Sequence, residues 1–434
     1  MNRPVLHLHI GAMKTGTTYL QEMMIANRDA LAEAGFVFAG SGWSRQVRAV
    51  QDLLRLDQHD PQIAALSEGA WDELVAEIHG RRDAASLMSM EFLSFTRRRA
   101  MARVVQDLEG VDVHVVLTVR DVTAAIPAQW QTSITSTRTH TWEEFQRGVQ
   151  RSASRLWLGH AMRGDTAVRE FRRAQDIARM LRTWGRLVPP DRLTVVTVPR
   201  ERRDPDELWQ RFSTAIGVDP AVATEPPAAS NPSLGHASAE LVRRLNLTLE
   251  GTLPWDYNRT VKAPLAQRFL GARRKLEEPA RLDAATAAFA ADWNRTTREA
   301  ILASGAQVVG DLDDLPTEPA PAAPGAGEGP GPAAVLDAAR DAWTGLTTLQ
   351  ERRRRRIARL TKQPRPEPLD VPTPAWFEEG DSDAALDRAV DDLTGLVRAL
   401  MRLRREMMEA SADDPDDPDE GDDANGADDT DGGP

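Results

Sequence analysis

Four short runs of apolar and β-branched residues predict buried strands, at Val5–Ile10, Ser86–Met90, Val111–Val119 and Leu193–Val198. Between and after these runs, apolar positions recur with the spacing of helices. The expected helices cover residues 17–34, 71–79, 97–108, 122–136, 168–187, 206–216, 237–249 and 280–303. Strands that alternate with helices are typical of βαβ units. We therefore expect an α/β fold, with a parallel sheet covered by helices on both faces.

The alternation of strands and helices ends near Leu315. We expect a first domain over residues 1–315, followed by a linker rich in Pro, Ala and Gly over residues 316–334. Helical segments then cover residues 335–410, with a proline-rich break at residues 364–374. Residues 411–434 form an acidic tail that we expect to be disordered.

Two segments of the C-terminal region have apolar residues at heptad spacing. The first has Val335, Ala339, Ala342, Leu346 and Leu349, and the second has Leu386, Val390, Leu393, Val397, Leu400 and Met407. The two segments can pair with each other, dock on the first domain, or mediate self-association. A run of five arginines at 352–356 is interpreted as a solvated helix face or a partner of the acidic tail.

Composition and charge exclude several classes of function. The chain of 434 residues has no cysteine, so disulfides and thiolate metal sites are excluded, and its eight histidines lack metal-ligand spacing. We therefore expect no metal. Residues 412–434 hold eleven acids, and without them the formal net charge of -12 falls to -1. This near-neutral body argues against a nucleic-acid partner. The N-terminus runs directly into a predicted strand, and no apolar run approaches a membrane span, so we expect a cytoplasmic protein.

The segment 9–18 (HIGAMKTGTT) follows a predicted strand and opens a predicted helix. Such a turn is a natural anion site, because its backbone N–H groups and the helix dipole point at the same place. Gly11 and Gly16 have the spacing of the P-loop of nucleotide triphosphatases, but Thr17 stands where that loop has its lysine. The lysine is Lys14 instead. Since the chain has only four lysines among 54 basic residues, this position favours a compact ammonium group.

The run Lys14-Thr15-Gly16-Thr17-Thr18 resembles the 5'-phosphosulfate loop of bacterial, actinobacterial-like sulfotransferases that use 3'-phosphoadenosine 5'-phosphosulfate (PAPS). The resemblance extends over residues 1 to about 315. It implies a P-loop-like fold and PAPS as cosubstrate. It also implies transfer of a sulfuryl group to a hydroxyl, or an amine, of a small molecule, lipid or glycan. The residues implied to bind the 5'-phosphosulfate are Gly11, Lys14, Thr15, Gly16, Thr17 and Thr18, with Lys14 also catalytic.

The resemblance also implies a site for the 3'-phosphate of the donor. Arg120 ends the strand Val111–Val119, where the family has an arginine that binds this phosphate. The serine that usually follows eight residues later is replaced by Ala128. Gln131, Thr132 and Ser133 are alternatives for the missing hydrogen bond.

A general base is needed to take the proton of the acceptor hydroxyl. Ser89-Met90-Glu91 follows the second predicted strand and is similar to a Ser-x-Glu of related bacterial sulfotransferases, so Glu91 is the candidate catalytic base. His140 and His160 are alternatives. His7 and His9 share one face of the first strand and are interpreted as packed residues.

Other interpretations stay open. The segment 231–235 (NPSLG), followed by Arg243 and Arg244, is also similar to the bacterial family, without an assigned role. Gly11 and Gly16 together with Asp121, after an apolar strand, are compatible with a P-loop kinase or NTPase. The third interpretation is a non-catalytic interaction protein that recruits a partner through its C-terminal helices, and Ala128 is the feature that keeps it open.

Overall fold

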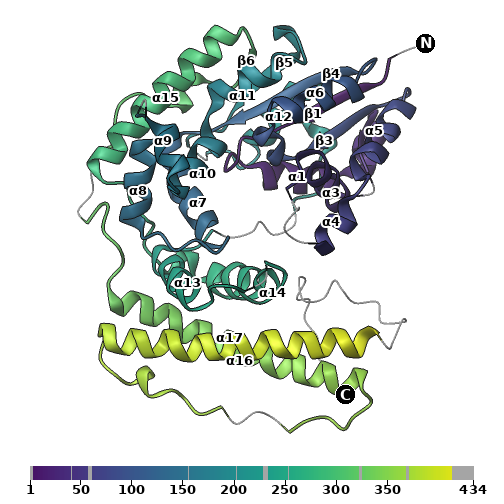
Figure 1. The fold of residues 1–434 in the computed structure, drawn as a ribbon. Coiled ribbons are helices and arrows are strands. Elements are labelled where there is room, and N and C mark those ends of the chain that lie inside the picture. The colour runs from purple at the N-terminus through teal and green to yellow at the C-terminus, as the bar shows by residue number, and fades with distance from the viewer. Residues whose placement is uncertain are drawn as a thin grey trace. The chain divides into compact units, whose positions relative to one another are not determined.

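The computed structural model describes residues 3–40, 42–56, 61–154, 156–201, 203–227, 233–252, 254–321, 325–367 and 371–412 (Figure 1). The chain forms two compact units that are interleaved in the sequence. The first contains Met1–Gln129, Phe145–Ser230 and Leu282–Ala326, and the second contains Trp130–Glu144, Asn231–Arg281 and Gly327–Pro434. The region that we expect to be one domain, residues 1–315, thus contributes to both units.

The first unit is built on one parallel sheet of six strands, which confirms the α/β fold class. The strands are β1 (Val5–His9), β2 (Phe36–Phe38), β3 (Ala85–Ser89), β4 (Asp112–Val119), β5 (Leu193–Thr197) and β6 (Gln307–Val309), in the spatial order β2-β3-β1-β4-β5-β6. Four of them lie where the sequence predicts strands. β2 and β6 have three residues each, too few for a recognisable apolar run.

The first unit contains the expected helices apart from the one over residues 237–249, two of them interrupted, and four more that the sequence did not predict, over residues 43–54, 61–67, 142–151 and 157–162. They are α1 (Thr17–Ala26), α2 (Arg28–Glu33), α3 (Trp43–Leu54), α4 (Pro61–Ser67), α5 (Ala70–Gly80), α6 (Arg98–Asp107), α7 (Val122–Ile134), α8 (Trp142–Arg151), α9 (Trp157–Met162), α10 (Thr166–Gln175), α11 (Ile177–Trp184), α12 (Glu207–Ile216) and α15 (Ala284–Ser304). The end of α7 and the start of α8 are assigned to the second unit. Asn27 divides the helix expected over 17–34, and Asp176 divides the helix expected over 168–187. The Asp176 carboxylate accepts a hydrogen bond from the Arg179 amide at 3.0 Å, so it caps α11.

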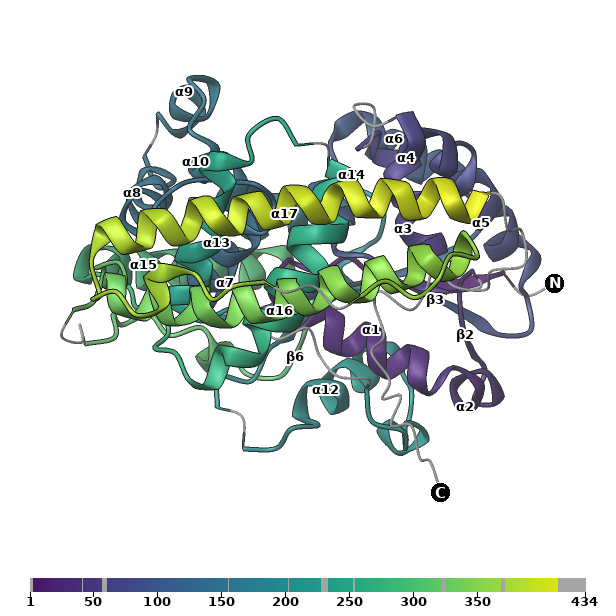
Figure 2. The same cartoon turned by 90° about the horizontal axis from the view of Figure 1, so that it is seen from below.

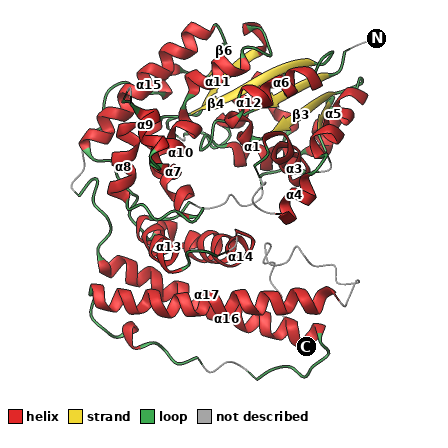
Figure 3. Cartoon of the chain, viewed as in Figure 1, coloured by secondary structure: helices red, strands yellow, loops and turns green. Residues whose placement is uncertain are grey.

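Helices cover both faces of the sheet, as the alternating pattern predicts (Figure 3). Leu6 and Leu8 of β1 belong to a buried cluster with residues of α3, α5, α6, α11 and α15. On the opposite face, Leu87 and Val116 pack with residues of α1 and α12. His9 lies on this second face, where its ring contacts Phe212 of α12 with 5.1 Å between centroids.

The second unit is helical. It contains α13 (His236–Thr248), α14 (Pro254–Tyr257), a π-helix over Asn258–Leu270, α16 (Pro332–Leu360) and α17 (Asp383–Ala412). Helices α16 and α17 lie side by side (Figure 2). Every apolar residue of both heptad series is buried. Of the three arrangements open at the sequence level, the structure shows two. The segments pair with each other, and they also pack on α13 and the π-helix, which belong to the expected first domain of residues 1–315. Self-association of the chain stays a prediction.

The expected linker contains no helix or strand at residues 316–321 and 325–331, but its last three residues, 332–334, belong to α16 (Pro332–Leu360). The proline-rich break contains none at residues 364–367 and 371–374. Helix α16 begins at Pro332, three residues before the expected start. The acidic tail lies outside the described residues from residue 413 onward. Among the described helices, none combines the length and the apolar composition that a membrane span requires.

Candidate functional site

The candidate site lies at the carboxyl ends of three neighbouring strands. β1 is the central strand of the three, between β3 and β4. The chain leaves β1 for the far edge strand β2, and later crosses over β1 on its way from β3 to β4. Such a change of direction opens a crevice beyond the carboxyl ends of the strands, where α/β proteins bind ligands. The loop after β1, Glu91 after β3 and Arg120 after β4 all lie at the carboxyl ends of these strands.

The loop between β1 and α1 has an unusual backbone. Gly11, Lys14 and Gly16 all have left-handed conformations, with φ angles of 84°, 65° and 85°. The loop is held to β4 by two hydrogen bonds, from the Ala12 amide to the Thr118 carbonyl at 2.8 Å and from the Thr118 amide to the Gly11 carbonyl at 2.7 Å. A lysine in this conformation costs about 1–2 kcal/mol. That strain is the kind of feature found where a side chain has a chemical role.

The loop leads directly into the N-terminus of α1. The first hydrogen bond of this helix runs from the Leu20 amide to the Gly16 carbonyl at 3.1 Å. The amides of Thr17 and Thr18 come before it, so the helix does not use them itself. No side chain of the described residues caps α1, and its first turn contains no acid. The positive end of the helix dipole is therefore presented at the loop.

A chain of hydrogen bonds holds the loop to both neighbouring strands. The Thr15 hydroxyl donates to the Ala12 carbonyl at 2.6 Å, and it lies 2.6 Å from the Thr118 hydroxyl. Thr118 therefore donates to Thr15. His9 Nε2 lies 3.1 Å from the Thr118 hydroxyl, and since the only proton of that hydroxyl is used, Nε2 carries the proton and donates.

The other ring nitrogen of His9 completes this chain. Because Nε2 is the protonated nitrogen, Nδ1 accepts from the Ser89 hydroxyl at 2.8 Å. Burial lowers the pKa of His9 to about 3, which is consistent with a neutral ring. The expectation that His9 is a packed residue is confirmed, and its ring also links β1, β3 and β4 beneath the loop.

Glu91 lies against this loop. It begins a short 3-10 helix, Glu91–Phe95, immediately beyond β3. A methyl group on Gly11 would come within 2.9 Å of the Glu91 Cβ, so the two backbones are in close contact. The buried Gln21 of α1 donates its amide to the Glu91 carboxylate at 3.1 Å and to the Ser89 carbonyl at 3.0 Å. Gln21 thus orients the carboxylate relative to the loop.

Arg120 also reaches the loop, because its guanidinium donates to the Lys14 carbonyl at 3.4 Å. The next residue, Asp121, has a structural role. Its carboxylate accepts from the Thr123 amide and from the Asn294 side chain, both at 2.8 Å. Asp121 therefore caps α7 and ties it to α15, and both interactions use its Oδ1 oxygen.

The remaining sequence candidates are divided between the two units. Gln131, Thr132, Ser133 and His140 belong to the second unit, where the Gln131 amide donates to the Leu234 carbonyl at 2.8 Å. His160 lies on α9 of the first unit. Within the segment 231–235, residues 231 and 232 lie outside the described residues. The two arginines that follow this segment, Arg243 and Arg244, pair with Glu240 at 2.7 and 3.0 Å.

The sequence analysis did not identify two glutamines whose side-chain amides support the site. Gln21 positions Glu91, and Gln175 at the end of α10 donates to the Met13 carbonyl at 2.9 Å. Both side chains are buried. A glutamine at a core-facing helical position is the only signal that the sequence carries for them.

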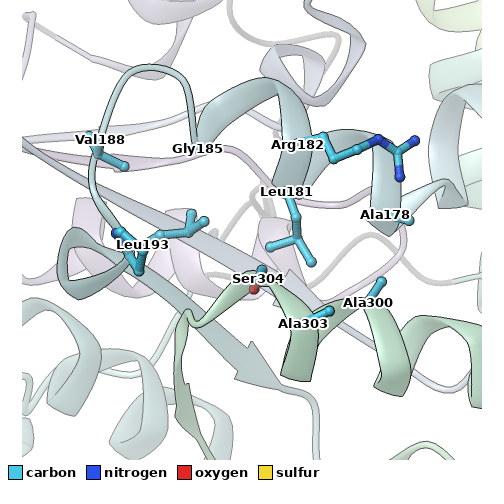
Figure 4. A pocket seen from close by; sticks show the side chains of 10 residues that line it. Ala178, Leu181, Arg182, Gly185, Val188, Leu193, Ala300, Ala303 and Ser304 are labelled. Carbon is cyan, nitrogen blue, oxygen red and sulfur yellow. The ribbon is translucent and has the colours of Figure 1, made fainter.

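Two cavities of the first unit lie at the amino ends of the strands, opposite the candidate site. The first is lined by residues of α11 and α15 and by Leu193 at the start of β5, with Arg182 among its lining residues (Figure 4). The second is lined by residues at the starts of β1, β3 and β4. Both lie at amino ends of strands, so neither belongs to the candidate site.

The close contact at Gly11 allows a test of the loop geometry. Gly11→Ala is expected to destabilise the protein by the left-handed penalty of about 1–2 kcal/mol plus about 1–3 kcal/mol from overpacking against Glu91. The matched control is Gly35→Ala, since Gly35 has a φ of 87° with no atom within 4 Å of the added methyl. Urea unfolding measures both. Equal losses in the two variants would contradict the contact with Glu91.

Within the described part of the chain, no group of three or more His, Asp or Glu side chains is arranged to hold a metal ion. Comparisons with known proteins complete the description of the site. No family model, no curated protein and no solved structure matches this chain.

Proposed function

We propose that the protein is a sulfotransferase that uses PAPS as its sulfuryl donor. The observation that carries this proposal is the conformation of Lys14 between Gly11 and Gly16 at the N-terminus of α1, with Arg120 bonded to its carbonyl. Lys14, the amides at the start of α1 and the Arg120 guanidinium thus lie at the carboxyl ends of β1 and β4. These groups match a donor that has a phosphosulfate at one end and a phosphate at the other.

Each group has a role in donor binding. The amides of Thr17 and Thr18 bind the 5'-phosphate, together with the dipole of α1. The hydroxyl of Thr15 supports the loop from below, because it is fully buried and bonded to Ala12 and Thr118. Arg120 binds the 3'-phosphate through charge-assisted hydrogen bonds. This division of roles explains why the side chain of Thr15 faces inward and Thr18 is exposed.

In the proposed reaction, the acceptor oxygen attacks the sulfur of PAPS. A new oxygen–sulfur bond forms while the bond from sulfur to the bridging phosphate oxygen breaks. The acceptor proton passes to the Glu91 carboxylate, which Gln21 holds in place. Negative charge develops on the leaving phosphate, and the Lys14 ammonium stabilises it. The products are the sulfated acceptor and 3'-phosphoadenosine 5'-phosphate (PAP).

The structure favours this proposal over phosphoryl transfer. A P-loop kinase needs a lysine where this chain has Thr17, and it needs an acid beside the metal. Asp121 is the residue that resembles such an acid, but its carboxylate caps α7 and binds Asn294. The only lysine of the loop, Lys14, precedes Gly16 instead of following it.

Binding of PAP tests the donor site. Calorimetry without Mg²⁺ is expected to show binding of PAP that is tighter than binding of ATP. Arg120→Ala is expected to weaken PAP binding about 10- to 100-fold, because each hydrogen bond to a charged group contributes about 1.5–3 kcal/mol. Arg186→Ala is the control, since Arg186 is exposed and lies after α11, on the way to the amino end of β5.

Two results would overturn the proposal. Nucleotide binding that requires Mg²⁺ and is tighter for ATP than for PAP would favour the kinase or NTPase interpretation. Absence of any nucleotide binding, in a protein with a normal unfolding transition, would favour a non-catalytic role. Equal PAP affinity in wild type and Arg120→Ala would remove Arg120 from the site while leaving the rest of the proposal in place.

A further inference from the structure

A group of arginines lies next to the candidate site, and the proposed donor does not account for it. The group consists of Arg97, Arg169, Arg173 and Arg179, and we call it the arginine cluster. Arg97 precedes α6, Arg169 and Arg173 lie on α10, and Arg179 lies on α11. Within the described residues, Arg97, Arg169 and Arg173 form no ion pair with a carboxylate. Arg97 also opens a run of three exposed arginines.

The arginine cluster is connected to both halves of the site. The guanidinium of Arg179 donates to the Ser94 carbonyl at 2.8 Å, and that of Arg173 lies over the Phe95 ring at 3.7 Å. Ser94 and Phe95 belong to the 3-10 helix that Glu91 begins. With a rise of ~2.0 Å per residue, this helix spans about 8 Å. At the other side, Gln175 at the end of α10 bonds to the loop that contains Lys14.

The like charges of the arginine cluster repel one another. Arg169 and Arg173 lie one helical turn apart, a spacing at which like charges destabilise a helix. The pKa of Arg173 is lowered to about 10 by desolvation and by the charges of Arg97, Arg179 and Arg169. Glu170 offsets part of this effect for Arg173, and Asp176 does so for Arg179. The Asp176 carboxylate is already engaged by Arg172 at 3.0 Å.

Two acids, Glu170 and Asp176, offset these charges only in part, so positive charge accumulates on the elements that contact the short helix begun by Glu91. An oxyanion would relieve the repulsion and form bidentate hydrogen bonds with guanidinium groups. We infer that the acceptor of the proposed sulfuryl transfer carries an anionic oxygen group, a carboxylate or a phosphate, that binds to the arginine cluster. The identification of the anion as the sulfuryl acceptor rests on the proposed function, whereas the existence of an anion site does not. Arg97, Arg169 and Arg173 bind the anion, and Arg179 positions the short helix that links the cluster to Glu91.

The test uses two simple anions and the full-length protein saturated with PAP, so that the donor site is occupied. Calorimetry measures the binding of citrate, for the carboxylate class, and of tripolyphosphate, for the phosphate class. One-to-one binding is expected for at least one of them, and the tighter probe identifies the class. The double variant Arg97→Gln/Arg173→Gln is expected to weaken that binding at least about tenfold, since charge-assisted hydrogen bonds are lost.

The controls separate this inference from the donor assignment. Arg186→Gln removes an exposed arginine outside the cluster and is expected to leave anion binding unchanged. The double variant is expected to keep the PAP affinity and the unfolding transition of the wild type. Absence of one-to-one anion binding in the wild type would overturn the inference, as would equal anion affinity in the double variant. Arginine-dependent anion binding in a protein that fails to bind PAP would instead overturn the donor and retain the anion site.

Discussion

Lys14→Ala is expected to lower the sulfuryl transfer rate by about 100- to 1,000-fold, the usual effect of removing one group that stabilises developing negative charge. In the proposed reaction the ammonium group interacts with the leaving phosphate oxygen mainly in the transition state, so we expect the loss in kcat and not only in KM. The measurement is the steady-state rate at which PAP forms, with the sulfated acceptor detected as the second product. Retained turnover would remove Lys14 from the reaction.

The chain contains a matched control for this substitution. Lys362 also has a left-handed backbone, with a φ of 53°, and it is exposed in the second unit. Lys362→Ala therefore removes the same ammonium group from the same kind of backbone, without any part in the site. It is expected to keep full activity. A second variant, Lys14→Arg, retains the charge but changes the compact ammonium into a planar fork, and is expected to recover only part of the rate.

Glu91→Gln is expected to reduce the rate by about 100- to 10,000-fold, because it removes the carboxylate that accepts the proton while it preserves size. PAP binding is expected to persist, since the base acts on the acceptor and not on the donor. The rate and PAP binding, measured on the same preparation, separate loss of the base from loss of the donor site.

The control for Glu91→Gln is Glu109→Gln, an exposed glutamate after α6 in the same unit. It removes one negative charge that lies outside the loop, and it is expected to leave the rate unchanged. If Glu91→Gln retains the wild-type rate, Glu91 is not the base and one of the histidines considered above takes its place. His160→Gln would then be expected to lower the rate instead.

The parts of the fold that depend on local spacing were predictable from the sequence. Val111–Val119 has enough consecutive β-branched residues to identify β4 within one residue. The Lys14–Thr18 run predicted the loop between β1 and α1, because its lysine, glycine and hydroxyls are adjacent in the chain. The heptad residues from Val335 and from Leu386 identified the buried faces of α16 and α17, since helical spacing determines which residues share a face.

Other features of the fold depend on contacts between distant residues. The expected helix over residues 17–34 ends early at Asn27, whose amide donates to the Met23 carbonyl at 2.9 Å and to the distant Glu225 carbonyl at 2.8 Å. Arg353 lies within a run of five arginines that we interpreted as a solvated face or a partner of the tail. It is only 2% exposed, and it donates to the Leu400 carbonyl at 2.9 Å. Composition does not identify such a residue, because its burial depends on contact with Leu400 of α17, 47 residues further along the chain.

The sequence by itself determined the fold class, the loop and the chemical types of its candidate residues, because these follow from periodicity and from neighbours along the chain. Only the tertiary structure decided which of them meet. The strand order places β1 between β3 and β4, and this order brings Glu91 and Arg120 to the loop that holds Lys14. The same order gathers Ser89, His9 and Thr118 beneath Thr15. Strand order and register arise from packing over the whole sheet, and no local pattern of residues encodes them.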